Sequence, residues 1–178
     1  MPTVSELRPP RCLCCGVASR PAGGLLAIHG HGLRDRQLRG PTEPGQRTTI
    51  IVIQVRRYEC LRCAAVMTVT PSAVLPRMLY AATAIALALA LYGLDGLSAR
   101  AVRAAVGAWQ VVGASSTGWK SLRRWIATST ALWSCIRESP ERWRVRQLAA
   151  RAATTLIASA PFSQPSLHAA IVGALHAR

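Results

Sequence analysis

The amino-terminal part of the chain has short apolar runs separated by Gly, Pro and charged residues, a pattern typical of strands and turns. The strongest run, residues 48–55, is β-branched at nearly every position and predicts a strand. Residues 65–70 predict a second strand and residues 25–28 a short third one. The charged segment 34–43, interrupted by Gly and Pro, predicts a loop or a mobile hairpin tip.

The pattern changes to helical spacing near residue 76. Residues 79–92 form the most apolar stretch of the chain and predict a buried core helix. A membrane-spanning helix is the alternative, because the uncharged run 78–94 has about the minimum length of 17 residues for a span. We favour the core helix, since Asp95 and a charge-rich region follow at once.

Two shorter helices are expected next. Ser98 is placed to cap a helix over 99–106, which Gly107 ends. A helix over 117–129 repeats apolar residues at three- and four-residue spacing on its inner face: Trp119, Leu122, Trp125 and Ile126. Two short helices joined by a turn are typical of a helix-turn-helix, whose second helix enters the major groove of DNA. The candidate DNA contacts are therefore the outward polar residues: Arg100, Arg103, Lys120, Ser121, Arg123 and Arg124.

The region 131–178 predicts two more helices. One covers 141–157. Its inward stripe consists of Trp143, Leu148, Ala152 and Leu156. Four arginines are expected on its exposed side: Arg142, Arg144, Arg146 and Arg151. The other runs from a Ser166 cap to about His176. Cys135 stands among apolar residues and predicts a buried small hydrophobe. We attach no function to this tail; packing on the helical bundle and self-association into a homo-oligomer are both open.

Four cysteines carry the candidate chemistry, in the pairs Cys12-x-x-Cys15 and Cys60-x-x-Cys63, with 44 residues between the pairs. Each pair has the spacing at which one turn aims two sulfurs at one point, and four thiolates are the set that structural zinc prefers. The alternative is free or disulfide-bonded thiols; disulfides are disfavoured because no secretory leader opens the chain. Cys14 could replace Cys12 or Cys15 as a ligand.

A metal also suits the small core expected for the first 75 residues, because a structural zinc ion contributes on the order of 10 kcal/mol to folding. His29 and His31 lie between the two pairs. Since four cysteines fill a tetrahedral site, we interpret both histidines as polar surface groups.

The formal net charge is +15, and 21 of the 22 basic residues are arginine. Such an excess favours a polyanionic partner, most often nucleic acid, and arginine binds phosphate and guanine through two parallel hydrogen bonds. GC-rich coding would raise Arg and Ala together, so composition alone does not identify double-stranded DNA as the partner.

The residues together resemble a known family. A Cys-x-x-Cys-Gly turn, a His-Gly-x-x-x-Arg segment and an Arg-Arg-Tyr-x-Cys-x-x-Cys turn are similar to the zinc-ribbon head of bacterial insertion-sequence transposases; here they are Cys12–Gly16, His31–Arg36 and Arg56–Cys63. Residues 96–102 and 120–125 look like the helix-turn-helix of those proteins. The resemblance covers residues 11–127 and is closest to small bacterial proteins of unknown function with the same layout. Ala64 departs from the pattern, since glycine is common there.

The sequence thus predicts an α+β fold: a zinc ribbon of three short antiparallel strands over 11–72, a helical domain over 76–130 and a helical tail over 131–178. We expect a cytoplasmic protein with one structural zinc ion that binds DNA in a sequence-directed way, either as a regulator or as a transposase-related part of a mobile element. No enzyme is expected, because transposition needs three converging carboxylates and the seven acidic residues are scattered. The alternatives are a zinc-stabilised adaptor for protein or RNA, or a membrane-associated protein that uses residues 78–94.

Overall fold

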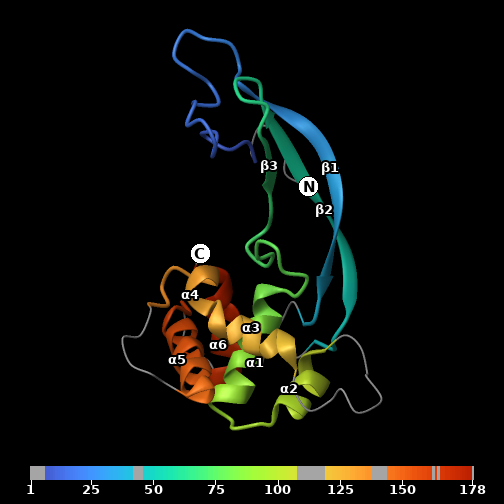
Figure 1. Cartoon of the computed structure of the whole chain (residues 1–178), viewed down its shortest axis with the longest axis vertical. Coiled ribbons are helices and arrows are strands. Elements are labelled where there is room, and N and C mark those ends of the chain that lie inside the picture. Colours follow the sequence, from blue (N-terminus) through green and yellow to red (C-terminus); the bar gives the residue numbers. More distant parts are fainter. Residues whose placement is uncertain are drawn as a thin grey trace. The chain divides into compact units, whose positions relative to one another are not determined.

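The computed structural model describes residues 7–41, 46–107, 119–137, 144–161, 163 and 165–177. Its architecture is α+β, with a three-stranded sheet in the order β1-β2-β3 followed by helices (Figure 1). The strands are β1 (Ile28–Arg39), β2 (Ile50–Cys60) and β3 (Val66–Val69). The helices are α1 (Ala82–Gly93), α2 (Ala99–Val106), α3 (Lys120–Ala127), α4 (Ser129–Leu132), α5 (Val145–Ala158) and α6 (Ser166–His176).

The chain forms two compact units. Unit 1 comprises the described residues within Met1–Gln37 and Val52–Pro71, and unit 2 those within Leu38–Ile51 and Ser72–Arg178. Two features differ from the predicted domain ranges. Residues 38–51, expected in the ribbon, belong to the helical unit, and α5 and α6 of the expected tail pack on α1 in that same unit.

Strand β1 is where the sequence prediction was wrong. The sequence predicts a short strand over 25–28 and a loop or a mobile hairpin tip over 34–43, whereas β1 runs without a break from Ile28 to Arg39. Nearly all of its central residues are exposed, so β1 shows no apolar alternation that sequence could reveal. Gly32 has a φ of +85° within the strand, the conformation of the glycine in one class of β-bulge. The strands expected over 48–55 and 65–70 are confirmed as β2 and β3, and β2 continues to Cys60.

The core of unit 1 is small. Antiparallel pairing of β2 with β3 sets Tyr58 opposite Met67. Both side chains are buried with Ile28 and with two of the cysteines, Cys12 and Cys60. So few apolar side chains bury little surface, and cross-linking of the cysteines by a metal would add stability that this core lacks.

Helix α1 is the centre of unit 2, as its apolar composition predicts. It is buried on nearly every side and packs against α2, α3, α5 and α6. Small residues allow close approach: a Cβ on Gly93 would lie 2.3 Å from the backbone nitrogen of Ala150 in α5. None of the helices in the part of the chain that the structure describes combines the length and apolar character that crossing a bilayer requires.

The loop end of the β1–β2 hairpin packs within unit 2. The backbone N–H of Arg39 donates to Leu79 O, and the N–H of Ala81 donates to Arg39 O, both at 2.9 Å. The Thr83 hydroxyl, buried in α1, donates to Pro41 O. The Thr48 hydroxyl donates to a carbonyl at the end of α2, that of Ala105, at 3.0 Å. Residues 38–51 therefore belong to the helical unit by hydrogen bonding as well as by position.

Helices α2 and α3 follow the sequence pattern closely. The Ser98 hydroxyl accepts from the backbone N–H of Ala101 at 3.2 Å, and α2 ends at Gly107, as predicted. The four apolar residues expected on the inner face of α3 are buried: Trp119, Leu122, Trp125 and Ile126. Rings of the two tryptophans pack edge-to-face with Tyr80. The predicted turn and helix start at 117 lie outside the described residues.

The carboxyl-terminal helices correct several predictions. Arg146 is not exposed: its guanidinium donates to Tyr92 O at 2.7 Å and Leu97 O at 3.2 Å, and lies 4.4 Å from the centre of the Tyr92 ring. Arg151 is also half-buried, whereas Arg144 is exposed. Trp143, Arg142 and the predicted start of this helix fall outside the described residues.

Two smaller expectations about the tail are also wrong. Ser166 is the first residue of α6 rather than its cap, because Pro165 occupies the N-cap position and makes no side-chain capping bond. Cys135 is half-buried rather than buried.

Candidate metal centre

Four sulfur atoms converge at one end of unit 1. The Sγ atoms of Cys12, Cys15, Cys60 and Cys63 all lie within 4.8 Å of one another. Cys12 Sγ is 3.6 Å from Cys63 Sγ, and Cys15 Sγ is 3.7 Å from Cys60 Sγ. With Zn–S bonds of about 2.3 Å, a tetrahedron separates its sulfurs by about 3.8 Å. The four cysteines therefore have the spacing of a tetrahedral tetrathiolate site before any ion is added.

The backbone explains why the sulfurs meet. In the first turn the N–H of Gly16 donates to Cys12 O at 3.0 Å, and in the second the N–H of Ala64 donates to Cys60 O at 2.8 Å. A second bond closes each turn, from Cys12 N–H to Val17 O and from Cys60 N–H to Ala65 O. The two turns are thus equivalent, and each presents its pair of sulfurs on the same side.

Both turns require a left-handed residue directly after the second cysteine. Gly16 has a φ of +71°, which glycine adopts without cost. Ala64 has a φ of +56°, a conformation that costs an L-residue roughly 1–2 kcal/mol. The departure from glycine at position 64 therefore keeps the turn geometry and strains the backbone.

The thiols differ in acidity. The pKa of Cys12 is lowered to about 6, chiefly because the backbone N–H groups of Cys15 and Cys14 stabilise its thiolate. A hydrogen bond from the backbone N–H of Ala65 also lowers the pKa of Cys63. Burial and the surrounding sulfurs outweigh it and raise the pKa of Cys63 to about 12. Such a spread is expected where several sulfurs share protons, because each thiolate opposes ionisation of the next. A divalent cation would remove that opposition.

The other candidate ligands lie outside the cluster. Cys14 is exposed, and its backbone N–H donates to Cys12 Sγ at 3.4 Å, so it supports a ligand rather than replacing one. His29 Nε2 is 2.7 Å from Leu26 O. His31 Nδ1 lies 3.0 Å from a carboxylate oxygen of Glu59. Both histidines are exposed, as the interpretation of them as surface groups expected.

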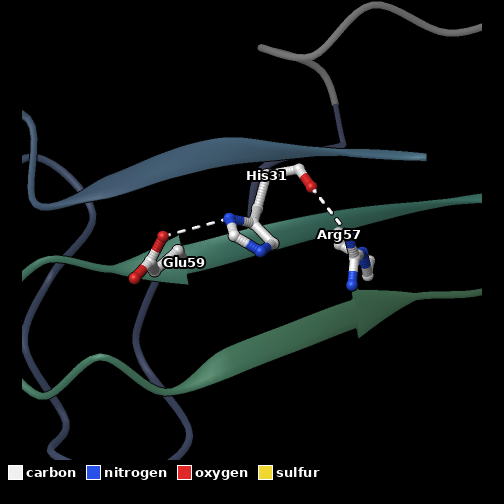
Figure 2. A network of polar contacts seen from close by, with 3 residues as sticks. All are labelled: His31, Arg57 and Glu59. Carbon is white, nitrogen blue, oxygen red and sulfur yellow. Dashed lines mark hydrogen bonds and ion pairs between the residues drawn. The ribbon is translucent and has the colours of Figure 1, made fainter. Parts of the chain in front are cut away.

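Polar contacts link β1 to the end of β2, the strand that leads into the second pair of cysteines. Figure 2 shows His31 of β1 between Glu59 and Arg57 of β2, and the Arg57 guanidinium donates to His31 O at 3.3 Å. Glu59 directly precedes Cys60, so this cross-strand pair holds the start of the second turn. Sequence reasoning missed it, although the strand pattern of residues 56–60 could have placed Arg57 and Glu59 on one face.

The candidate DNA contacts lie in unit 2. Arg100, Lys120, Arg123 and Arg124 are exposed, and Arg103 and Ser121 are half-buried. Helix α2 packs on α1, whereas α3 packs on α1, α4 and α5. The segment 108–118 that joins α2 to α3 in the predicted helix-turn-helix lies outside the described residues. The structure therefore places these side chains on the surface without describing the turn between the two helices.

No family model, curated protein or solved structure matches this chain. The resemblance to transposase zinc ribbons therefore remains an expectation from the sequence motifs.

Proposed function

We propose that the chain is a non-catalytic DNA-binding protein whose amino-terminal unit is stabilised by one structural zinc ion. Four thiolates at tetrahedral spacing match the ligand set that zinc takes in structural sites. Four protein ligands leave no open coordination position for a substrate or an activated water molecule. The ion would supply folding free energy rather than reaction chemistry.

The observation that supports DNA as the partner is the charge of the α2–α3 region. Arg100, Lys120, Arg123 and Arg124 are exposed, and no Asp or Glu occurs between residues 96 and 137. Within that segment no carboxylate can neutralise these cations. The backbone phosphates of double-stranded DNA offer the complementary charge, and guanine edges accept paired hydrogen bonds from arginine. In this proposal α3 enters the major groove, and the protein acts in the cytoplasm, where bacterial DNA lies.

The direct test is binding to random double-stranded DNA between about 50 and 200 mM salt, where counterion release makes affinity fall steeply. We expect Arg123→Ala/Arg124→Ala to weaken binding by about tenfold or more and to reduce the salt slope by roughly 2. Both side chains are exposed, so the variant should keep its thermal stability.

The matched control, Arg137→Ala/Arg144→Ala, removes two exposed charges from elsewhere in the same unit. Equal losses of DNA affinity in the two variants would show that binding depends on the total charge of the protein and not on the side chains of α3. No binding by the parent chain would reject DNA as the partner.

A further inference from the structure

Three leucines protrude from the turns around the sulfur cluster. Leu13 and Leu61 occupy equivalent places, each directly after the first cysteine of its pair, and are 90% and 64% exposed. Leu25, 93% exposed, lies two residues before Ala27, whose carbonyl accepts from the N–H of Leu61 at 2.9 Å. One exposed leucine needs no explanation, but here two protrude from the two cysteine turns and a third from the loop to which the second turn is bonded.

Arginines border the same turns. Arg11 directly precedes the first turn and Arg62 lies within the second, while Arg20 follows a serine whose carbonyl accepts from Ala27; all three are exposed. Residues 7–33 and 59–71 contain four arginines and one carboxylate, that of Glu59, which pairs with His31. Together with the formal −2 of a zinc tetrathiolate, these five side chains leave a net charge of +1. We call the six side chains the knuckle surface: Arg11, Leu13, Arg20, Leu25, Leu61 and Arg62.

We propose that the knuckle surface is a second DNA contact, in which the arginines bind phosphates and the leucines enter the minor groove. This inference rests on the proposed function, because it assumes DNA as the partner. Proteins that enter the minor groove combine arginines with protruding aliphatic side chains that wedge between base steps. A second copy of this chain is disfavoured as the occupant, since two positive surfaces would face each other.

The rigidity of the turns supports the wedge. The backbone bonds of both turns, together with the shared sulfur cluster, hold Leu13 and Leu61 on closed loops of fixed geometry. A side chain separates stacked bases more effectively when the backbone that carries it moves little. The zinc ion thus has a second consequence in this proposal, since it stiffens the loops that press into DNA.

The arginines are tested by the full, zinc-loaded chain carrying Arg11→Gln/Arg20→Gln/Arg62→Gln. With about 0.9 counterions released per phosphate contact, the slope of log K against log salt should fall by nearly 3, and affinity at 0.1 M salt by roughly tenfold per contact. The control, Arg34→Gln/Arg77→Gln/Arg137→Gln, removes three exposed charges elsewhere and should leave the slope unchanged. An unchanged slope in the first variant, or equal losses in both, overturns the proposal.

The leucines are tested separately with Leu13→Ala/Leu61→Ala. We expect this variant to keep the salt slope and to lose the DNA bend, measured as energy transfer between dyes at the two duplex ends. No bend in the parent complex, or a bend that survives in the variant, overturns the wedge. Tighter binding to vesicles of anionic phospholipid than to DNA, abolished by the leucine changes, would assign the surface to membranes instead.

Three further outcomes separate this inference from the proposed function. If the arginine variant loses zinc to a colorimetric chelator and keeps its DNA slope, the arginines serve only to balance the thiolates, and the inference fails. If Arg123→Ala/Arg124→Ala abolishes binding while the knuckle variants bind normally, the inference fails and the proposed function stands. If the parent chain binds no DNA, the proposed function itself fails.

Discussion

Substitution of Ala64 by glycine should stabilise the metal unit, although alanine is normally the more stabilising residue. Ala64 has a φ of +56°, which costs a residue with a Cβ roughly 1–2 kcal/mol. Glycine removes that cost but loses roughly 0.5–1 kcal/mol more conformational freedom on folding. The net gain should be about 0.5–1 kcal/mol, worked from these two opposing effects.

The reverse change at the equivalent turn gives a matched control. Gly16 has a φ of +71°, and a Cβ added there would meet no atom within 4 Å. Gly16→Ala therefore tests backbone conformation without a steric clash and, from the same two opposing effects, should lose about 0.5–1 kcal/mol. The double swap, Gly16→Ala/Ala64→Gly, should show both effects added, because the two turns have separate backbone bonds.

Metal affinity is the most sensitive assay, because binding and folding of this unit share one free energy. In competition with a chelator, Ala64→Gly should raise zinc affinity by about 2- to 5-fold, and Gly16→Ala should lower it by a similar factor, as about 1.4 kcal/mol equals tenfold. Weaker zinc binding by Ala64→Gly would refute the reasoning, since it would mean that residue 64 is not left-handed in solution.

Three other predictions concern the site and the helical unit. Cys60→Ser should release the metal and loosen unit 1 while the helical circular dichroism of unit 2 persists; retention of a full zinc equivalent would contradict the ligand assignment. Because the pKa of Cys12 lies at about 6, its thiol is already ionised above that pH, so calorimetry should show one proton fewer released per zinc ion as pH rises through 6. A proton count that stays constant would argue against a lowered Cys12 pKa. Arg146→Met should lower the free energy of unfolding by about 1–2 kcal/mol, because the part-buried carbonyl of Tyr92 and the more exposed carbonyl of Leu97 lose a charged donor; a variant as stable as the parent would show that these bonds are not made.

The cluster of four cysteines could be predicted from the sequence because its geometry is local. Two pairs of cysteines with two residues between them are enough to predict two turns, and the four sulfurs do converge. The Ser98 cap and the inner face of α3 were equally predictable, since a cap and a helical stripe depend only on near neighbours.

What could not be predicted depends on partners far along the chain. β1 is polar and exposed through its centre, so only pairing with β2 makes it a strand. Arg146 has the helical position of a surface residue, yet the carbonyls of Tyr92 and Leu97, about fifty residues earlier, draw it inward. The left-handed conformation of Ala64 also runs against residue preference, because the second turn must match the first.

The discontinuity of unit 2 limits how the protein can be divided. Its residues 38–51 lie in sequence between the two cysteine pairs, so the chain passes from one unit to the other three times. A fragment that starts after residue 71 would lose the strand ends that bond to Leu79, Ala81, Thr83 and Ala105. Such a truncation would leave the start of α1 and the end of α2 open to solvent. An exchange of the cysteine-bearing unit between related proteins should therefore succeed only when residues 1–37 and 52–71 are replaced together. Residues 38–51, at the end of the β1–β2 hairpin, must stay with the helices to which they are bonded.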